Sequence, residues 1–354
     1  MIYLNNAATS WPKPASVVQA VTAALDSQPV SALRSNLSQH DDLPAQLRQA
    51  LGRVFNISDY GRIFFCSGAT DGLNRVLQGI SWRHCDSSPD SHNSVLRPLH
   101  NCVSVQADGT YSLTAINHCS NVTGRVADVA DACRQAHRRG ALLLLDAAQS
   151  AGCIPIDVDG WGVDILVFTG HKALFGPMGM GGYYVRRGIS LRPLLFGGTG
   201  RDSSIIDYGP ENEWEYEVGT PNLPGLAGLK AGVDYVLERG VAAIVRKEQQ
   251  QALWLIDALR RLPQVQLYVA QAPSVQGPVV SFNIAGLQPA DVGYILQNSY
   301  GITVRTGLHC APLIHRQLGT ERYGTVRVSL SDFTSEADLQ ALVGAVADIA
   351  QSIS

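Results

Sequence analysis

Short apolar runs alternate with longer segments of helical period over the first two thirds of the chain. From about residue 15 to residue 235 this alternation is typical of β-α units around a parallel sheet. The runs Gly140–Leu145 and Asp164–Phe168 are of strand length and almost wholly apolar, as strands covered on both faces must be. We therefore predict that these two runs are central strands of an α/β sheet.

The pattern changes after Gly240. A helical period around Ile244–Leu262 is followed by short strand-like pieces such as Val279–Ile284, and the last helix begins with the capping-box pair Ser335 and Asp338. We predict two domains, a large one formed by residues 15–235 and a smaller α+β one formed by residues 1–14 together with 236–354.

Composition narrows the function classes. Of the 354 residues 45% are hydrophobic and only 16% are charged, which indicates a large core, and a net charge of -3 disfavours nucleic acid and acidic membranes as partners. No apolar run is long enough for a membrane span, and the first residues resemble no signal peptide, so we predict a cytoplasmic protein. The seven scattered cysteines show no C-x-x-C pair, which predicts reduced thiols and no metal site.

A strand-like run that ends at Cys66 leads into the small residues Ser67–Gly72, which open a helix. Such a turn points free backbone N–H groups outward and could hold a phosphate. An ordinary capped turn between a strand and a helix is the alternative.

Two charged residues follow buried strands. Asp146 comes after four leucines and needs a partner, which a protonated ring nitrogen of pyridoxal phosphate could supply, although a helix cap or an arginine pair would also fit. Of the four lysines, Lys172 alone emerges from a buried strand, and burial lowers the pKa of an amine. Lys172 is therefore our candidate for a Schiff-base lysine.

Two further segments carry chemical signals. The glycines of Gly176–Gly182 lead into a strand-like Tyr183–Val185 rather than a helix, which excludes a dinucleotide fingerprint. Cys310 lies in a turn-rich segment beside His309 and near Arg305, surroundings that favour a thiolate. We take Cys310 as a candidate nucleophile, with a small buried hydrophobe as the alternative.

Taken together, the motifs resemble those of the class V aminotransferase family of pyridoxal phosphate enzymes, in the branch of cysteine desulfurases and selenocysteine lyases. The loop Arg305–Ala311 is similar to that of the second group of desulfurases. The resemblance implies fold type I, with a large cofactor-binding domain built on a mainly parallel seven-stranded sheet and a smaller α+β domain that carries the Cys310 loop. The matching segments are 3–9, 69–70, 91–95, 120–124, 146–149, 169–172, 217–222, 305–312 and 327–329.

The same resemblance implies roles for individual residues. Lys172 and Cys310 would be catalytic together with His92, which would stack on the cofactor ring, and Asp146 would pair with the ring nitrogen. Thr220 would reach the phosphate from the partner subunit of a homodimer. The implied cofactor contacts are Ala69, Thr70, His92, Asn121, Asp146, Gln149, Thr169, His171, Lys172 and Thr220. The implied substrate contacts are Asn121, Arg305, His309 and Arg327, with Arg327 clamping the carboxylate.

The implied reaction converts L-cysteine to L-alanine and leaves a persulfide on Cys310 for a sulfur acceptor, which could be a protein. Two alternatives stay open. A related lyase or transaminase, including a selenocysteine lyase, could use the same cofactor site. A noncatalytic scaffold or sulfur-relay protein could also keep the fold.

The chain departs from the family pattern in two places. Residues 80–92 form a short polar connection in which Ser91 replaces the acidic residue usual before His92. Only residues 106–113 separate a strand at Val103 from the next strand, and the pair Asp108–Gly109 predicts a tight turn there. So short a link cannot reach a parallel neighbour. Either the sheet is rearranged locally or its edge is open.

Overall fold

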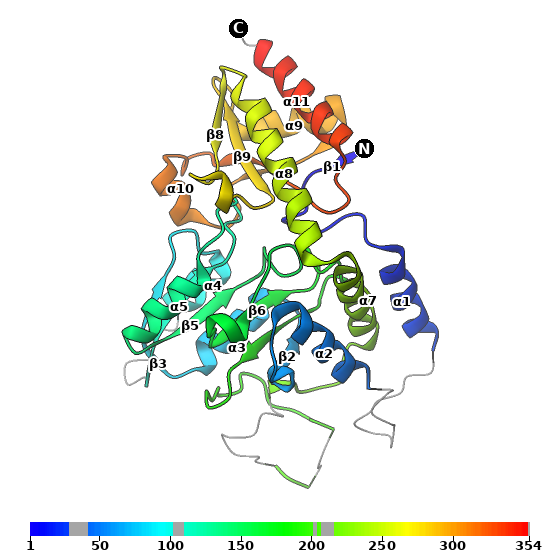
Figure 1. The fold of residues 1–354 in the computed structure, drawn as a ribbon, viewed down its shortest axis with the longest axis vertical. Coiled ribbons are helices and arrows are strands. Elements are labelled where there is room, and N and C mark those ends of the chain that lie inside the picture. Colours follow the sequence, from blue (N-terminus) through cyan, green and yellow to red (C-terminus); the bar gives the residue numbers. More distant parts are fainter. Residues whose placement is uncertain (28–41, 102–109, 201–203, 207–215, 353–354) are drawn as a thin grey trace.

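A computed structural model describes residues 1–27, 42–101, 110–200, 204–206 and 216–352. Its larger sheet has six described strands in the order β2-β7-β6-β5-β4-β3, and the run β3 to β6 is parallel while β7 is antiparallel to both neighbours (Figure 1). The predicted α/β fold is confirmed. The strands are β2 (Ile63–Cys66), β3 (Trp82–Ser87), β4 (Tyr111–Asn117), β5 (Ala141–Asp146), β6 (Ile165–Thr169) and β7 (Gly181–Val185).

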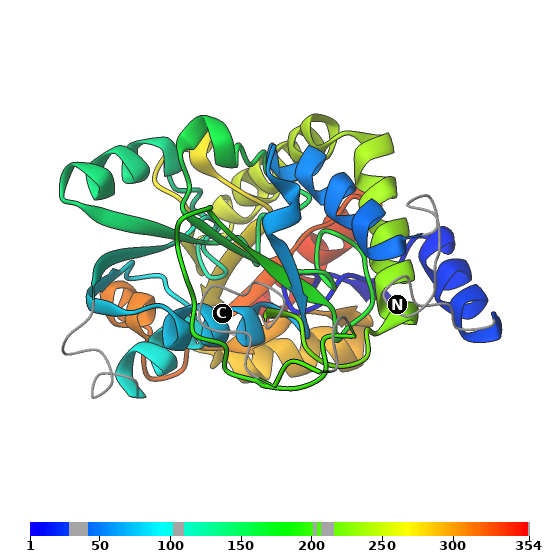
Figure 2. The ribbon, with the colours of Figure 1, turned by 90° about the horizontal axis from the view of Figure 1, so that it is seen from below.

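Helices cover both faces of this sheet (Figure 2). In β5, Leu143 and Leu145 pack into one core while Leu144 packs into the other, because successive side chains of a strand point to opposite faces. The first face is covered by α2 (Leu43–Phe55), α5 (Val129–Arg138) and α7 (Leu223–Arg239), and the second by α3 (Ala69–Gly79) and α4 (Asn93–Asn101). Helix α1 (Ala15–Asp26) packs along α7, and α6 (Val158–Trp161) and the 3-10 turn η2 (Tyr60–Arg62) are short.

A second, antiparallel sheet has its own hydrophobic core. Its order is β11-β12-β9-β8, and the predicted strand Val279–Ile284 is β9. The capping box of Ser335 and Asp338 starts the last helix as predicted. These elements are β8 (Val265–Tyr268), β9, β11 (Arg305–Gly307), β12 (Thr325–Ser329), α9 (Pro289–Tyr300), α10 (Pro312–Leu318), α11 (Glu336–Gln351) and η5 (Pro273–Val275).

Two connections join the sheets. Helix α8 (Val241–Arg260) contributes Ile244 to the large core and Leu255 to the small one. The N-terminal strand β1 (Ile2–Tyr3) pairs in parallel with β10 (Ile302–Thr303) of the smaller part. The exact division into residues 15–235 and 1–14 plus 236–354 stays a prediction. Among the described helices, none has the length and apolar character that crossing a membrane requires.

One expectation about the sheet edge was wrong. The polar stretch taken as a connection forms the edge strand β3, in which Trp82 is buried and Arg83 and His84 are exposed. Helix α4 then supplies the crossover that makes β3 and β4 parallel. An edge strand tolerates polar side chains on its open face. Because we predicted strands from runs of apolar residues, this polar strand was missed. The predicted strand at Val103 and the turn at Asp108–Gly109 lie outside the described residues, so six strands are described where the resemblance implies seven.

Candidate active site

The candidate site is a cavity of about 320 Å³ between the two sheets. It lies at the carboxyl ends of β4, β5 and β6, where open α/β sheets place their ligands, and β11 and β12 close it from the other side. The structure therefore brings together most residues predicted from the sequence. Those that line it are Ala69, Thr70, His92, Asn121, Asp146, Gln149, Thr169, His171, Lys172, Arg305 and Arg327.

The turn between β2 and α3 forms one end of the cavity. Gly68 precedes the helix with φ 151°, no side chain caps the first turn, and the N–H groups of that turn are the usual donors to an anion. A Cβ on Gly181 would lie 2.6 Å from the Cα of Gly68, so glycine is required where the two backbones meet. The Thr169 hydroxyl and the His171 Nδ1 atom lie buried nearby without a partner. This end has the donors that a phosphate needs.

Lys172 and Asp146 occupy the centre of the cavity. Burial lowers the pKa of Lys172 to about 8, although the Asp146 carboxylate works in the opposite direction. Burial also raises the pKa of Asp146, which accepts a hydrogen bond from the backbone N–H of Ala148 at 3.0 Å. The Lys172 amine is thus available as a nucleophile near neutral pH. A second cationic group would stabilise the charged form of the Asp146 carboxylate.

His92 lies at the side of the cavity with a defined tautomer. Its Nδ1 atom accepts from the Ser94 backbone N–H at 3.1 Å and lies 2.7 Å from the Ser94 hydroxyl, which leaves the ring proton on Nε2. Burial and the nearby Lys172 and arginines lower the pKa of His92 to about 4. The ring is therefore neutral and suited to stacking on a flat ligand; its stacking role stays a prediction.

Two arginines face each other across the ladder of β11 and β12. Arg305 and Arg327 are directly paired positions, and such like-charged neighbours repel each other unless an anion lies between them. Arg327 donates to the Asn121 carbonyl at 3.1 Å and to Asn5 Oδ1 at 3.2 Å, while its Nε has no partner among the described residues. Burial lowers the pKa of Arg327 to about 9. This pair has the charge and donors that a carboxylate would need, and its role as a substrate clamp stays a prediction.

Cys310 lines an outer cavity of about 390 Å³, which shares Thr70 and His92 with the first cavity. Its Sγ is 3.5 Å from Arg305 Nη2. Its backbone has φ 60°, and that of His309 has φ 49°, both unusual for residues with a Cβ. Two hydrogen bonds hold the loop: Asn93 N–H donates to the Cys310 carbonyl at 2.7 Å, and Asn121 Nδ2 donates to the His309 carbonyl at 2.6 Å.

Two predicted residues lie elsewhere. The ring of His309 is not part of the cavity wall, because its Nε2 lies 3.0 Å from the Thr325 hydroxyl, and burial lowers the pKa of His309 to about 2. Thr220 is exposed and also lies outside the cavity wall. Its contribution across a homodimer stays a prediction.

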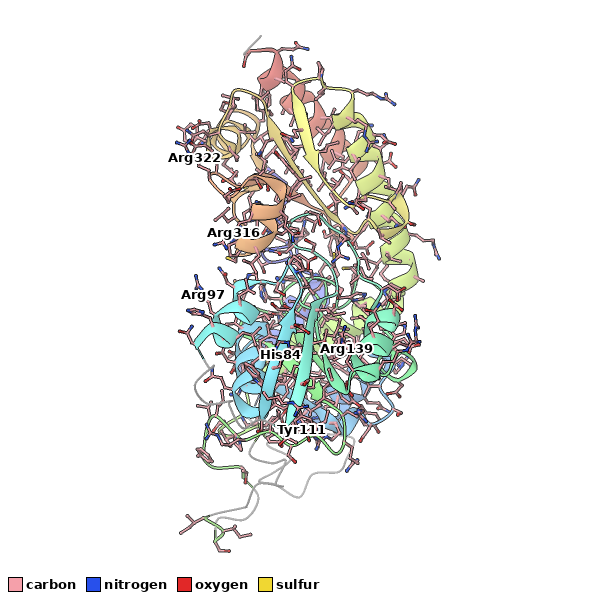
Figure 3. The ribbon with its side chains drawn as sticks, turned by 90° about the vertical axis from the view of Figure 1, so that its left-hand side faces the viewer. His84, Arg97, Tyr111, Arg139, Arg316 and Arg322 are labelled. Atoms are coloured by element: carbon pink, nitrogen blue, oxygen red, sulfur yellow. The ribbon has the colours of Figure 1, made fainter. Side chains whose placement is uncertain are left out.

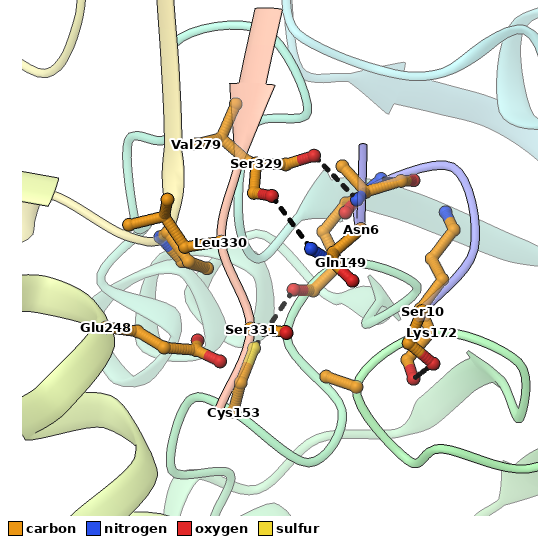
Figure 4. A pocket seen from close by; sticks show the side chains of 13 residues that line it. Asn6, Ser10, Gln149, Cys153, Lys172, Glu248, Val279, Ser329, Leu330 and Ser331 are labelled. Atoms are coloured by element: carbon orange, nitrogen blue, oxygen red, sulfur yellow. Dashed lines mark hydrogen bonds between the residues drawn. The ribbon is translucent and has the colours of Figure 1, made fainter. Parts of the chain in front are cut away.

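Sequence reasoning assigned no role to several residues around the site. Asn5 orients Arg327, and the Ala7 carbonyl accepts from Gln149 Nε2 at 3.0 Å. Behind Lys172 lies a smaller cavity where the buried Glu248 carboxyl faces Cys153 and Gln149 (Figure 4). The N-terminal residues sit inside a matching motif and could have been chosen on that ground, whereas Glu248 lies on a helix face with no such signal.

The residues present fit pyridoxal phosphate. Among the described residues, four buried polar atoms on the cavity wall have no partner. A phosphate would satisfy the Thr169 and His171 atoms and a carboxylate would satisfy that of Arg327, whereas the amide oxygen of Asn121 accepts and would be satisfied by a donor such as a phenolic hydroxyl or a substrate amine. The four atoms are Thr169 Oγ1, His171 Nδ1, Asn121 Oδ1 and Arg327 Nε.

Comparisons with known proteins agree with this geometry. The chain is 30% identical to a probable cysteine desulfurase of Methanothermobacter thermautotrophicus, over 99% of this chain and 94% of that protein. It is 31% identical to a cysteine desulfurase of Klebsiella pneumoniae, over 84% of this chain and 80% of that protein. An apo structure of a cysteine desulfurase from Thermococcus onnurineus superposes with a TM-score of 0.89 at 28% identity, covering 99% of this chain and 95% of that one.

The family model of class-V aminotransferases matches two overlapping segments, residues 2–106 and 99–342, and thus nearly the whole chain. The match includes both sheets and every residue that lines the cavity. With its full-length relatives named as cysteine desulfurases, this chain belongs to the class V aminotransferase family.

Proposed function

We propose that this protein is a pyridoxal phosphate-dependent cysteine desulfurase that converts L-cysteine to L-alanine and forms a persulfide on Cys310. The observation that carries the proposal is the position of Cys310 Sγ, 3.5 Å from Arg305, which itself lines the cavity that holds Lys172, Asp146 and Arg327. Simple transamination needs no thiol at that place. The names of the full-length relatives support the same activity.

Each end of the cavity would hold one part of the reactants. The first turn of α3, with Thr70, Thr169 and His171, would bind the phosphate, and Lys172 would bond covalently to the cofactor. Arg305 and Arg327 would bind the substrate carboxylate and thereby orient its α-carbon toward Lys172. When bound, pyridoxal phosphate supplies an electron-withdrawing ring that stabilises negative charge on the α-carbon.

Three side chains would then carry out the proton and sulfur transfers. The Asp146 carboxylate would hold a proton on the ring nitrogen of the bound cofactor, which would preserve the electron-withdrawing power of the ring. Lys172 Nζ, whose pKa is about 8, takes the α-proton and returns a proton to the product. The Cys310 thiolate attacks the substrate sulfur, the C–S bond breaks, and alanine and a Cys310 persulfide result without net oxidation. The guanidinium of Arg305 donates to Cys310 Sγ at 3.5 Å and so helps to position the sulfur.

Two features of the assembly belong to the proposal. We place Thr220 of a second copy at the phosphate, since Thr220 is exposed and the family resemblance implies a homodimer. A protein that accepts the sulfur is the further partner we infer.

The test compares Cys310→Ala with the wild type, both loaded with pyridoxal phosphate and supplied with L-cysteine and dithiothreitol. Cys85→Ala serves as the matched control, since burial raises the pKa of the Cys85 thiol to about 12 and leaves it protonated. We expect Cys310→Ala to keep the visible cofactor band but lose alanine and sulfide release, and Cys85→Ala to keep both. Full sulfide release by Cys310→Ala would refute the proposal, and keto-acid formation instead of alanine would favour a transaminase.

A further inference from the structure

Arg97 lines the outer cavity that Cys310 also lines, and two further exposed arginines lie along the same edge of the molecule. The cavity of about 390 Å³ is lined by Cys310, His92, Thr70 and Arg97 among others. Arg97, Arg316 and Arg322 are exposed and form no ion pair among the described residues. We call these three residues the arginine rim. Figure 3 shows them along one edge of the molecule, on both sides of the boundary between the two sheets.

The fold places two members of the rim through the Cys310 loop itself. Helix α4 begins at Asn93, whose N–H holds the Cys310 carbonyl, and α10 begins at Pro312, two residues after Cys310. Arg97 and Arg316 each lie four residues further on, which puts each arginine about one helical turn from the start of a helix that adjoins the Cys310 loop. The two helices thus each carry one cation near this loop.

The arginines of the rim carry uncompensated charge. Several other arginines are matched to carboxylates, as in Arg75 with Asp71 at 2.8 Å and Arg239 with Asp332 at 2.8 Å, whereas the three of the rim have no such partner among the described residues. The chain as a whole carries a net charge of -3, so an excess of cations at one opening is a local feature. Glu321, beside Arg322, is an exposed acidic residue of the same surface and only partly offsets it.

The acceptor must reach the persulfide sulfur where Cys310 lies, in the outer cavity. The hydrogen bonds to the Cys310 and His309 carbonyls, together with the contact of the His309 ring with Thr325, tie the loop down at three points. A loop held in this way does not carry its persulfide outward, so the acceptor thiol must come to Cys310.

We propose that the arginine rim binds an acidic surface of a protein that presents a cysteine thiol to Cys310. This inference rests on the proposed function, because only a persulfide on Cys310 gives the acceptor something to take. The three guanidiniums stand on separate elements and do not converge on one point (Figure 3), which suits an extended acidic surface better than a small anion. Three cations on a chain of negative net charge are also too few for strong binding to a nucleic acid.

The transfer balances without a further reactant. The acceptor thiolate attacks the outer sulfur of the persulfide, the bond between that sulfur and Cys310 Sγ breaks, and a persulfide forms on the acceptor. Cys310 leaves as a thiolate and takes the proton that the acceptor thiol has lost, so the numbers of thiols and persulfides are conserved.

The test uses three synthetic peptides of equal length that contain one cysteine flanked by glutamates, by glycines and serines, or by lysines. For each peptide the rate of alanine release from L-cysteine is divided by the rate with uncharged dithiothreitol, and mass spectrometry counts the sulfur gained by the peptide. We expect the glutamate peptide to exceed the lysine peptide about tenfold at low ionic strength, and the advantage to vanish at about 0.5 M salt.

Variants assign this preference to the rim. Arg97→Ala and Arg316→Ala should each reduce the ratio for the glutamate peptide by up to about fivefold, the upper range for an exposed ion pair. Arg53→Ala, which removes from α2 an exposed arginine that forms no ion pair with any described residue, is the matched control and should leave the ratio unchanged. Fluorescence anisotropy with a labelled glutamate peptide that has serine in place of cysteine measures binding independently of turnover.

Several results would overturn the inference. Equal ratios for the three peptides, or an acidic preference that survives in the double variant of Arg97 and Arg316, would show that the rim does not select the acceptor. Glutathione used as efficiently as the glutamate peptide would indicate a small acceptor, and an RNA oligonucleotide that displaces the labelled peptide at equal concentration would indicate a nucleic-acid surface. A loss of alanine release with dithiothreitol in the wild type would instead refute the proposed function.

Discussion

The low pKa of Lys172 makes a quantitative prediction about how the protein acquires its cofactor. Only a neutral amine attacks the aldehyde of pyridoxal phosphate. With a pKa of about 8, about a quarter of Lys172 is neutral at pH 7.5, compared with about 0.1% for a lysine with the ordinary value of 10.5. Capture by Lys172 should therefore rise with pH to a midpoint near 8, and should exceed that of a free lysine about 200-fold at pH 7.5.

Replacing Asp146 by Asn tests the origin of this value. The Asp146 carboxylate raises the pKa of Lys172 against the larger effect of burial, so Asp146→Asn should shift the midpoint downward, by about one pH unit or more for a nearby opposite charge. The assay mixes cofactor-free protein with pyridoxal phosphate between pH 6 and 10, stops the reaction with borohydride and measures the modified Lys172 peptide by mass spectrometry. The pH dependence of a free lysine derivative corrects for ionisation of the cofactor.

Lys13 provides a control within the same molecule. Burial lowers the pKa of Lys13 to about 8 as well, but Asp146 is not among the causes, so Asp146→Asn should leave the pH dependence of any Lys13 modification unchanged. An unchanged or higher midpoint for Lys172 in Asp146→Asn would refute the electrostatic account. A wild-type midpoint near 10.5 would refute the burial account as well.

Three further outcomes follow from the site. Below pH 8 Lys172 is protonated in both the folded and the unfolded state, so the folded state bears the full cost of burying the charge. Lys172→Met should therefore raise the free energy of unfolding of the cofactor-free protein at pH 7 by up to about 3 kcal/mol, as measured in thermal melts. This gain should shrink between pH 8 and 10.5, where the wild-type lysine loses its proton in the folded state. An equal gain at both ends of that range would contradict this reasoning. Arg327→Lys should weaken L-cysteine binding about 10- to 100-fold in spectral titrations because one ammonium cannot replace a bidentate guanidinium, and unchanged binding would remove Arg327 from the substrate site. Gly181→Ala should cost about 1–3 kcal/mol in denaturant unfolding because its Cβ would meet backbone atoms, whereas Gly198→Ala has open space around it and should cost little.

The sequence revealed the site best where chemistry and strand pattern coincide. Asp146 and Lys172 were found because each follows a run that is apolar on both faces, and the same feature places both at the carboxyl edge of the sheet. The strand-turn-helix around Gly68 was predicted for the same reason.

The features that we did not predict from the sequence depend on contacts between residues that are far apart along the chain. The edge strand β3 alternates polar and apolar residues too weakly to stand out, so it was taken for a connection. The direction of the His309 ring is set by Thr325 on a neighbouring strand, and no local pattern indicates it. The facing positions of Arg305 and Arg327 likewise come from strand register, which a single chain read in order does not show.

The path of the N-terminal residues has a consequence for how the protein is made. Asn5 bridges to Ser329, the Ser10 hydroxyl donates to the Lys172 carbonyl at 2.7 Å, and β1 pairs with β10 near residue 302. These early residues thus contribute to a site whose other half is translated much later in the chain. The large sheet can form while translation continues, but its carboxyl edge stays uncovered until β10 and β12 emerge. A pause late in translation would therefore prolong the exposure of this edge to chaperones or to other nascent chains.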